Sequence, residues 1–397
     1  MAWTVAVVAL AMGAKVAGSA IGARFAGIHG REALALGSGL SGLGAMGIVV
    51  ALVALNLGVV SDTGYTVLVF TALVTSLAAP QLLRWVVAGW EVPAEEAARL
   101  DQEAIRAASE ILGARRILLP TRGGANSRFA AHILTSVFDD PDVTVLAVDV
   151  PRRRSGLGRR RAGSHADPSV VDEELGEVRH TVARTESRDS AAAIAREARL
   201  GYDLMLVGAS TDDRGATGLF STMVDRILAL VDIPTVVVRL PAGPSAGDHT
   251  ARRVLVPVAA TRSSRAAEEL AYSLIRNTDG SALAVHIVNR PDGQGMMFDA
   301  VTERDMLHTG HEMVAAAAAF GERLGVAVEG DVHVASNPEA EIVALANGGD
   351  FDLLVIGALS RPLADRPFFG HRVHYILQHT LIPVAIVTLP GHAHGAR

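Results

Sequence analysis

The stretch that decides the fold occurs twice in the chain, as YDLMLVGAS at residues 202–210 and as FDLLVIGAL at residues 351–359. Each copy is an apolar run that closes on a glycine, which is typical of a buried strand followed by a loop. Further along, IPTVVV at residues 233–238 is matched by IPVAIV at residues 382–387. Upstream, residues 252–258 match residues 115–121. The sequence therefore predicts an internal repeat.

Strands and helices alternate within each copy. In the first copy we expect strands at 115–121, 143–150, 177–185, 203–208 and 234–239, and helices at 126–138 and 189–200. This alternation predicts an α/β fold with a mostly parallel five-stranded sheet and helices on both faces. The two domains then span residues 114–240 and 251–390, with a linker at 241–250 and a tail at 391–397.

Each predicted domain ends in an apolar strand, Thr235–Val238 in the first and Val384–Val387 in the second. An unpaired edge of this kind promotes aggregation. We expect the two final strands to pair with each other, which makes an intrachain pseudo-dimer of the two domains.

The front of the chain has a different composition. The 397 residues are 50% hydrophobic and 20% charged, and almost all ionisable side chains follow Pro93. In residues 1–90 we expect an α-helical membrane segment of three spans, at about Ala2–Gly27, Glu32–Val60 and Tyr65–Ala88, because each reaches the length that crosses a bilayer. A secretory signal peptide is the alternative for the first span, but no cationic region precedes its apolar run.

Charge and cysteine content limit the remaining classes. The net charge of −6 argues against a nucleic-acid partner, and the absence of cysteine excludes disulfides and cysteine-ligated metals. Arg24 and Arg31 flank the first connection, whereas residues 61–64 carry no positive charge. The positive-inside rule then predicts a multi-pass protein of the cell membrane, with the amino terminus outside and all residues after Trp90 in the cytoplasm.

Two features join or interrupt these parts. Residues 91–113 read as an amphipathic connector helix that places Leu100, Ile105, Ala108 and Leu112 on one side. Lys15 lies about halfway along the first span, where a charge is costly unless it is paired or reaches water. We interpret Lys15 as a functional transport residue, with snorkelling toward the cytoplasmic end as the alternative.

At the repeated strands and loops, residues 114–390 resemble tandem universal stress protein domains, many of which bind ATP. The resemblance implies a glycine-bearing phosphate loop of the form G-x2-G-x9-G-[ST]. By position, the loop residues are Gly208, Thr211, Ser221 and Thr222 in the first copy and Gly357, Ser360, Gly370 and His371 in the second. The family's adenosine-binding Asp is replaced by Arg122 and Ala259, so purely structural repeats remain the alternative to an ATP cofactor.

The membrane block resembles the last three helices of monovalent cation:proton antiporters, carried by REAL at 31–34, GAMGIVVA at 44–51 and VTSLAAPQLLRW at 74–85. The resemblance implies the carboxyl-terminal membrane and regulatory portion of a sodium or potassium antiporter, with Lys15 next to the ion site. The remaining helices would come from a missing segment or an adjacent antiporter chain, and the lipid bilayer, monovalent cations and protons would be partners. The alternative function is a membrane-tethered stress sensor that binds nucleotide without transport.

Weaker patterns are interpreted as structural. The arginines at 152–154 and 159–161 read as a solvated loop, and His308, His311, Glu312, His371 and His374 read as helix-surface residues rather than metal ligands. No catalytic motif is present, so we expect neither an enzyme nor a metal cofactor.

Overall fold

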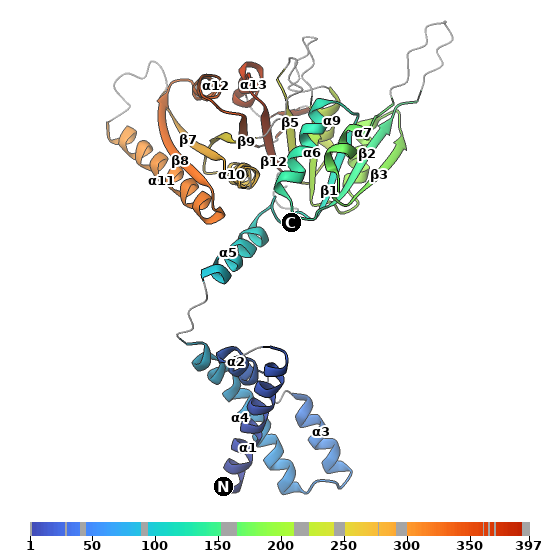
Figure 1. The fold of residues 1–397 in the computed structure, drawn as a ribbon, viewed down its shortest axis with the longest axis vertical. Coiled ribbons are helices and arrows are strands. Elements are labelled where there is room, and N and C mark those ends of the chain that lie inside the picture. Colours follow the sequence, from blue (N-terminus) through green and yellow to red (C-terminus); the bar gives the residue numbers. More distant parts are fainter. Residues whose placement is uncertain are drawn as a thin grey trace. The chain divides into compact units, whose positions relative to one another are not determined.

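The fold is described from a computed structural model, which covers residues 2–27, 30–39, 45–88, 94–151, 165–209, 222–241, 251–276, 278–290, 300–359, 361–363, 366–368 and 371–390. The chain divides into two compact units, residues 1–97 and 98–397 (Figure 1).

The first unit is helical. Its elements are α1 (Ala2–Phe25), α2 (Arg31–Gly39), α3 (Ala45–Asn56) and α4 (Asp62–Val87). Among the described residues, α4 is long and apolar enough to cross a membrane, and α3 offers a shorter apolar stretch at Gly47–Asn56. Parts of the expected second span lie in α2 and α3, and residues 40–44 between these two helices are outside the described residues. Length and composition thus support a spanning helix for the third predicted segment.

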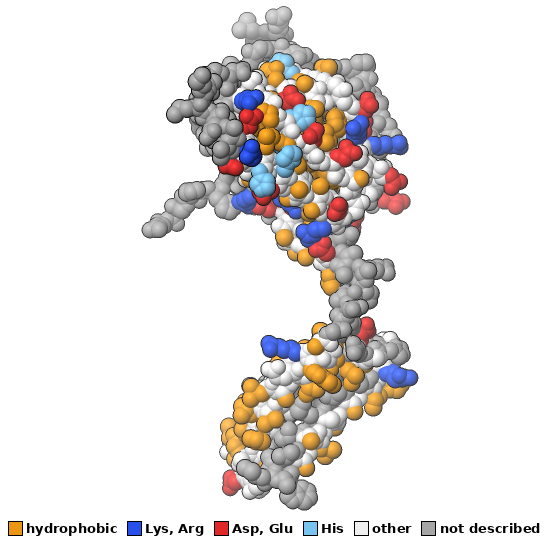
Figure 2. Space-filling view, turned by 90° about the vertical axis from the view of Figure 1, so that its left-hand side faces the viewer, with side chains coloured by type: hydrophobic (Ala, Val, Ile, Leu, Met, Phe, Trp, Pro, Cys, Tyr) orange, Lys and Arg blue, Asp and Glu red, His pale blue; other side chains and the backbone are white. Residues whose placement is uncertain are grey.

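The surface of α1–α4 carries much of the exposed apolar area of the chain. On the face drawn in Figure 2, hydrophobic side chains predominate among the coloured side chains of this unit, whereas charged and histidine side chains lie among them on the sheet-containing unit. The exposed large hydrophobic residues here include Leu10, Ile21, Phe25, Val49, Val50, Leu57, Leu73, Leu77 and Trp85. An apolar surface of this extent is unusual for a part of a protein that contacts only water.

The second unit is built on one ten-stranded sheet with the order β3-β2-β1-β4-β5-β12-β9-β6-β7-β8. The first half of the sheet contains β1 (Arg116–Thr121), β2 (Asp142–Asp149), β3 (His180–Glu186), β4 (Leu204–Gly208) and β5 (Thr235–Arg239). The second half contains β6 (Arg253–Pro257), β7 (Ser281–Asn289), β8 (Ala327–Ala335), β9 (Leu353–Leu359) and β12 (Val384–Leu389). Pairing is parallel within each half, as the alternating sequence predicts.

The two halves meet through their final strands. Strands β5 and β12 pair antiparallel, with Val237 opposite Ile386. Arg239 of β5 is 6% exposed and crosses this seam, since its Nη2 donates to the Thr380 carbonyl oxygen at 3.0 Å and its Nη1 donates to that of Leu377. The two strands that the sequence analysis identifies as open edges therefore lie side by side within one chain.

Helices form a layer on each face of the sheet (Figure 1). One layer holds α6 (Ala125–Val137), α7 (Ser169–Leu175), α10 (Arg262–Ile275) and α11 (Ala300–Leu324), and a single hydrophobic core runs beneath it through both halves. The other layer holds α8 (Ser190–Ala198), α9 (Thr222–Leu230), α12 (Pro338–Gly348) and α13 (His371–His379) over two separate cores. A short hairpin of β10 (Arg361–Leu363) and β11 (Arg366–Phe368) follows β9.

The repeated aromatic–aspartate pair before β4 and β9 explains why the two copies fold alike. The Asp203 carboxylate accepts the backbone N–H groups of Arg115 and Arg116, both at 2.9 Å. In the second half, Asp352 accepts the equivalent amides of Arg252 and Arg253 at 2.9 and 2.8 Å. Each pair fastens the start of β1 or β6 to the strand beside it, which fixes the central register of each half.

The connector, defined here as residues 98–113, differs from its prediction at one end. Helix α5 (Ala94–Ala108) ends at Ala108 rather than Gly113, because Ser109 Oγ accepts the amides of Ile111 and Leu112 at 3.1 and 2.8 Å and turns the chain. Ala108 is consequently exposed, and Ile111 is fully buried in the core beneath α6 and α10.

Candidate ligand pockets at the strand ends

Each half of the sheet has a crevice where its strand order reverses. In the first half, β1 lies between β2 and β4, and the chain passes from β1 to β2. In the second half, β6 lies in the same way between β7 and β9. In open parallel sheets, ligands bind beyond the carboxyl ends of the strands at such a point. The structure has a pocket at both places.

The first-half pocket measures about 270 Å³ and lies at the carboxyl ends of β1 and β4. Thr121 Oγ1 accepts the Gly123 amide at 3.0 Å, and Gly124 then precedes α6, which begins at Ala125 without a side-chain cap. Gly123 and Gly124 have φ values of +82° and +111°, which a residue with a side chain rarely adopts. The pocket is bordered by one cationic residue, the exposed Arg122.

The second-half pocket is larger, at about 460 Å³, and more polar residues line it. Thr261 caps α10 by accepting the Ser264 amide at 3.1 Å, and Ser264 Oγ accepts the Ala259 amide at 2.8 Å. The wall also contains a charged pair, because Arg372 Nε lies 3.6 Å from a Glu339 carboxylate oxygen. Its remaining polar residue, His286, has Nδ1 2.9 Å from the Val258 carbonyl oxygen.

The two loop glycines have a packing role that their motif did not predict. A Cβ built on Gly357 would lie 2.2 Å from the Ser263 carbonyl carbon and oxygen. A Cβ on Gly208 would lie 2.4 Å from the Asn126 carbonyl carbon. Glycine at these positions lets the first turn of α10 or α6 lie directly against the end of β9 or β4. The same close contact places the helix amino terminus at the wall of the pocket.

Only some of the predicted loop residues lie at the pockets. Gly208 lines the first-half pocket and Gly357 lines the second-half pocket. Thr222 begins α9 and His371 begins α13, where the His371 side chain is exposed. The other predicted residues, Thr211, Ser221, Ser360 and Gly370, lie outside the described residues. Lys15 lies within α1, but its side chain is outside the description.

Several pocket residues were missed by the sequence analysis. They are Thr121, Gly123 and Gly124 in the first half and Thr261, Ser264, His286, Glu339 and Arg372 in the second. A hydroxyl residue just after a buried strand was an available signal for Thr261, because it predicts a helix cap at the strand end. Arg372 and Glu339 come from different helices, so no sequence spacing brings them together.

The described residues contain no group of three or more His, Asp or Glu side chains placed to hold a metal ion. His308 Nε2 instead lies 3.3 Å from a Glu312 carboxylate oxygen on the surface of α11.

A family match covers the second half of the sheet-containing unit. Residues 250–388 match the universal stress protein family. No curated protein matches the chain.

Three solved structures illustrate the similarity. A universal stress protein from Archaeoglobus fulgidus DSM 4304 is 15% identical, with a TM-score of 0.46, 70% of this chain and 98% of that chain covered. The functionally unknown protein PA1789 from Pseudomonas aeruginosa PAO1 is 14% identical, with a TM-score of 0.47 and coverages of 72% and 95%. A universal stress protein family member from Burkholderia pseudomallei is 20% identical, with a TM-score of 0.29 and coverages of 36% and 99%.

Proposed function

We propose that the second-half pocket binds a nucleotide, with ATP as the expected ligand, and that this binding regulates residues 1–90. Residues 250–388, which contain this pocket, match the universal stress protein family. The observation that carries the proposal is the pocket itself. It lies at the switch point of β6 and β9, and the α10 amino terminus, two hydroxyl residues and the Arg372 guanidinium border it.

The second half is preferred over the first for physical reasons. Its pocket is larger, and about 460 Å³ lies within the range of small-molecule sites. Arg372 Nε lies 3.6 Å from a Glu339 carboxylate oxygen, which is longer than a normal hydrogen bond. A phosphate can therefore bind the Arg372 guanidinium through two shorter, parallel hydrogen bonds. In both halves the Asp expected of ATP-binding relatives is replaced, by Arg122 in the first and Ala259 in the second. Adenine selectivity therefore has to come from the pocket walls.

Calorimetric titration of the full chain in detergent with ATP tests this proposal. We expect saturable binding that Arg372→Gln weakens about tenfold, because a charge-assisted hydrogen bond is lost. The matched control is Arg122→Gln in the first-half pocket, which should leave ATP affinity unchanged. Absence of ATP binding to the unaltered chain would refute the nucleotide proposal. Weakening by Arg122→Gln alone would assign the site to the first half instead.

We propose further that residues 1–90 are the last three helices of a monovalent cation:proton antiporter and that residues 114–390 are tandem stress-protein domains that regulate it from the cytoplasm. The support is the sequence resemblance of three segments, the spanning length of α4 and the exposed apolar surface of α1–α4. The alternative, a tethered nucleotide sensor without transport, shares all of these except the resemblance. Coding sequence upstream of, or beside, the Met1 codon discriminates the two readings.

The absence of natural cysteine makes the predicted topology directly testable. Ser61→Cys lies in the second connection and Thr309→Cys on α11, and both positions are exposed. In intact cells, a membrane-impermeant maleimide should label the first and spare the second. Labelling of Thr309→Cys from outside would overturn the cytoplasmic placement.

Lys15→Ala should change the pH profile of exchange in the assembled transporter, and an unchanged profile would leave Lys15 as a snorkelling residue.

A further inference from the structure

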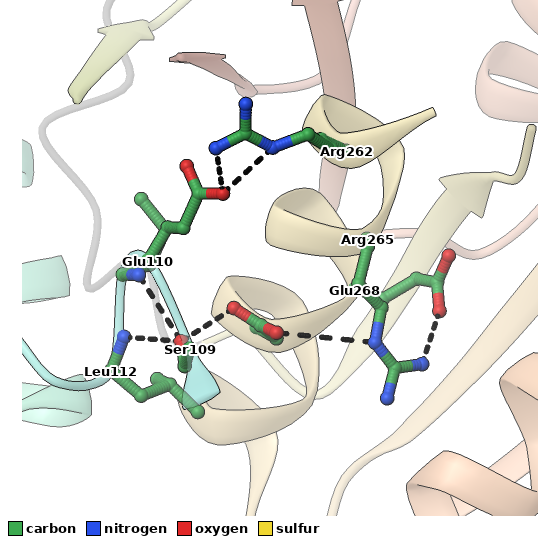
Figure 3. A network of polar contacts seen from close by, with 8 residues as sticks. Ser109, Glu110, Leu112, Arg262, Arg265 and Glu268 are labelled. Atoms are coloured by element: carbon green, nitrogen blue, oxygen red, sulfur yellow. Dashed lines mark hydrogen bonds and ion pairs between the residues drawn. The ribbon is translucent and has the colours of Figure 1, made fainter. Parts of the chain in front are cut away.

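The connector docks on both halves of the sheet-containing unit. Asp101 accepts two hydrogen bonds from Arg323 of α11, at 2.7 and 3.0 Å, and Arg106 pairs with Asp139 of the first half. Its closing turn lies along α10 (Figure 3), where the Glu110 carboxylate accepts from Arg262 Nε at 2.8 Å. The fully buried Ile111 fixes this turn in the core.

The turn also contacts a buried acidic pair on α10. Ser109 Oγ donates to a Glu269 carboxylate oxygen at 2.5 Å, and the adjacent Glu268 accepts from Arg265 Nη1 at 3.1 Å. Arg265 Nε lies 3.9 Å from the other Glu269 oxygen. Glu268 and Glu269 are only 6% and 8% exposed. Two buried carboxylates thus share one guanidinium.

When both Glu268 and Glu269 are ionised, their two negative charges face the single positive charge of Arg265. Buried charges are tolerated when they are paired, so the second carboxyl group is held most easily in its protonated form. In agreement, burial raises the pKa of Glu268 to about 7 against the opposing effect of Arg265. Burial likewise raises the pKa of Glu269, although Ser109 and Arg265 oppose the change.

The fold does not require this acidic pair, as the first half shows. Gly208 packs on Asn126 as Gly357 packs on Ser263, so Ala131 and His132 of α6 take the places of Glu268 and Glu269. In α6, His132 Nδ1 instead lies 3.1 Å from Glu174 of α7. The paired carboxylates therefore occur in the half whose helix receives the connector turn.

We propose that docking of residues 101–112 on α10 is a proton-sensitive latch, in which the docked state holds one proton on the Glu268–Glu269 pair and alkaline conditions release the connector. A proton bound more tightly in the docked state than in the released state favours docking at low pH. The latch therefore weakens as pH rises toward the value at which the docked pair loses its proton, and its strength then levels off. The proposal is independent of any ligand in the second-half pocket.

The groups around Glu268 and Glu269 do not account for a change in docking between pH 6 and 8.5. The connector contributes Ser109 and Glu110, and α10 contributes Arg262, Arg265 and the fully buried Tyr272. Helix α11 contributes Phe320, whose ring lies under the Arg265 guanidinium, and the Arg323–Asp101 pair. Burial raises the pKa of Tyr272, and the hydrogen bond from Arg323 lowers the pKa of Asp101, so neither titrates between pH 6 and 8.5.

Hydrogen–deuterium exchange on the full chain in detergent tests the latch. Protection of the peptide covering residues 101–114 is measured from pH 6 to 8.5, after correction for the intrinsic dependence of exchange on pH. We expect protection to fall as pH rises through 7, by at most about tenfold per pH unit, and to level off above pH 8. Constant protection over this range would overturn the proposal.

Variants separate the latch from general loosening. Glu269→Gln and, independently, Glu268→Gln leave one carboxylate for one guanidinium, so each should keep the connector protected at pH 8.5 to within twofold of pH 6. Protection of α10 itself shows that each variant is folded. The matched control is Glu174→Gln in the first half, which should retain the wild-type slope. A slope that persists in both α10 variants, or that disappears in the control, would refute the assignment to the acidic pair.

Discussion

Gly208 and Gly357 are predicted to be phosphate-loop glycines, and both line the pockets, where phosphate binding stays a prediction. Their immediate physical requirement is different, because a methyl group at either position would overlap the backbone of a helix. Sequence spacing locates such a glycine at a strand end, but it carries no information about which helix approaches it.

This close approach predicts a large cost for adding one carbon atom. Gly357→Ala should lower the free energy of unfolding by about 2–3 kcal/mol, because backbone atoms of Ser263 at 2.2 Å cannot move as a flexible side chain can. Urea denaturation followed by circular dichroism measures the change. Gly348→Ala is the matched control, since a Cβ there meets nothing within 4 Å. Equal stability of the two variants would contradict the packing role.

His333, on the outer strand β8, provides a test of local electrostatics. Its Nδ1 lies 2.8 Å from Glu341 and its Nε2 lies 3.0 Å from Asp331. Burial lowers the pKa of His333, but the two carboxylates outweigh burial and raise it above its usual 6.5. Because the folded-state value is raised, this interaction stabilises the fold fully below pH 6.5 and is lost as pH rises through the folded value.

Nuclear magnetic resonance titration of the His333 ring protons checks the sign of this shift. We expect a midpoint above 6.5 in the full chain, and Glu341→Gln should lower it. Glu339→Gln, on the same helix but paired with Arg372, should leave it unchanged. A midpoint at or below 6.5 in the unaltered chain would show that burial wins over the carboxylates.

At the scale of elements, strands were easier to predict than helices. The expected strand at residues 203–208 matches β4 closely, because a continuous apolar run bounded by a turn has few other interpretations. Helices α7 and α9 were not predicted. Helix α7 buries only Val171 and Leu175 among its seven residues, so its sequence shows little amphipathic pattern. The end of α5 was missed because a serine hydrogen bond, not a glycine or proline, stops the helix.

The two halves are joined in part by Arg239 of β5, whose side chain contacts backbone groups 138 and 141 residues further along the chain. No local sequence pattern predicts this contact. Arg239→Met should lower the free energy of unfolding by about 2–3 kcal/mol, because it leaves the Leu377 and Thr380 carbonyl oxygens without their buried donor. Thermal and urea denaturation measure the loss. Arg196→Met, on the exposed face of α8, is the control and should stay within about 0.5 kcal/mol of the unaltered chain. A neutral Arg239→Met would show that the carbonyl groups find other partners.

For the whole molecule, composition alone predicted the division into an apolar front and a charged remainder, and the structure divides at Ala97. Composition does not identify the partner of the apolar surface, because lipid and a second helical chain are equally apolar. The joining of both halves in one sheet was expected from the apolar final strands. Its register, with Val237 opposite Ile386, follows from packing on both faces and was beyond sequence reasoning.

That register makes the pseudo-dimer testable in a chain without natural cysteine. The double variant Val237→Cys and Ile386→Cys places two thiols on directly opposed residues of an antiparallel pair, within disulfide range. Mild oxidation should give an intramolecular bridge at a rate independent of protein concentration, detected as a monomer with faster electrophoretic mobility. Val237→Cys alone should give no such species. Covalent dimers of the double variant would indicate that the final strands pair between chains.

The position of β12 has a consequence for how the protein is made. It lies in the centre of the sheet, yet it is the last of the ten strands to leave the ribosome. Translation of the residues between β5 and β12 takes roughly 7–30 s at cellular elongation rates. During that interval the first half presents β5 as an open template to any neighbouring nascent chain. The interval during which β5 stays unpaired, rather than the stability of the finished sheet, is therefore the stage at which pairing between chains competes with completion of the ten-stranded sheet.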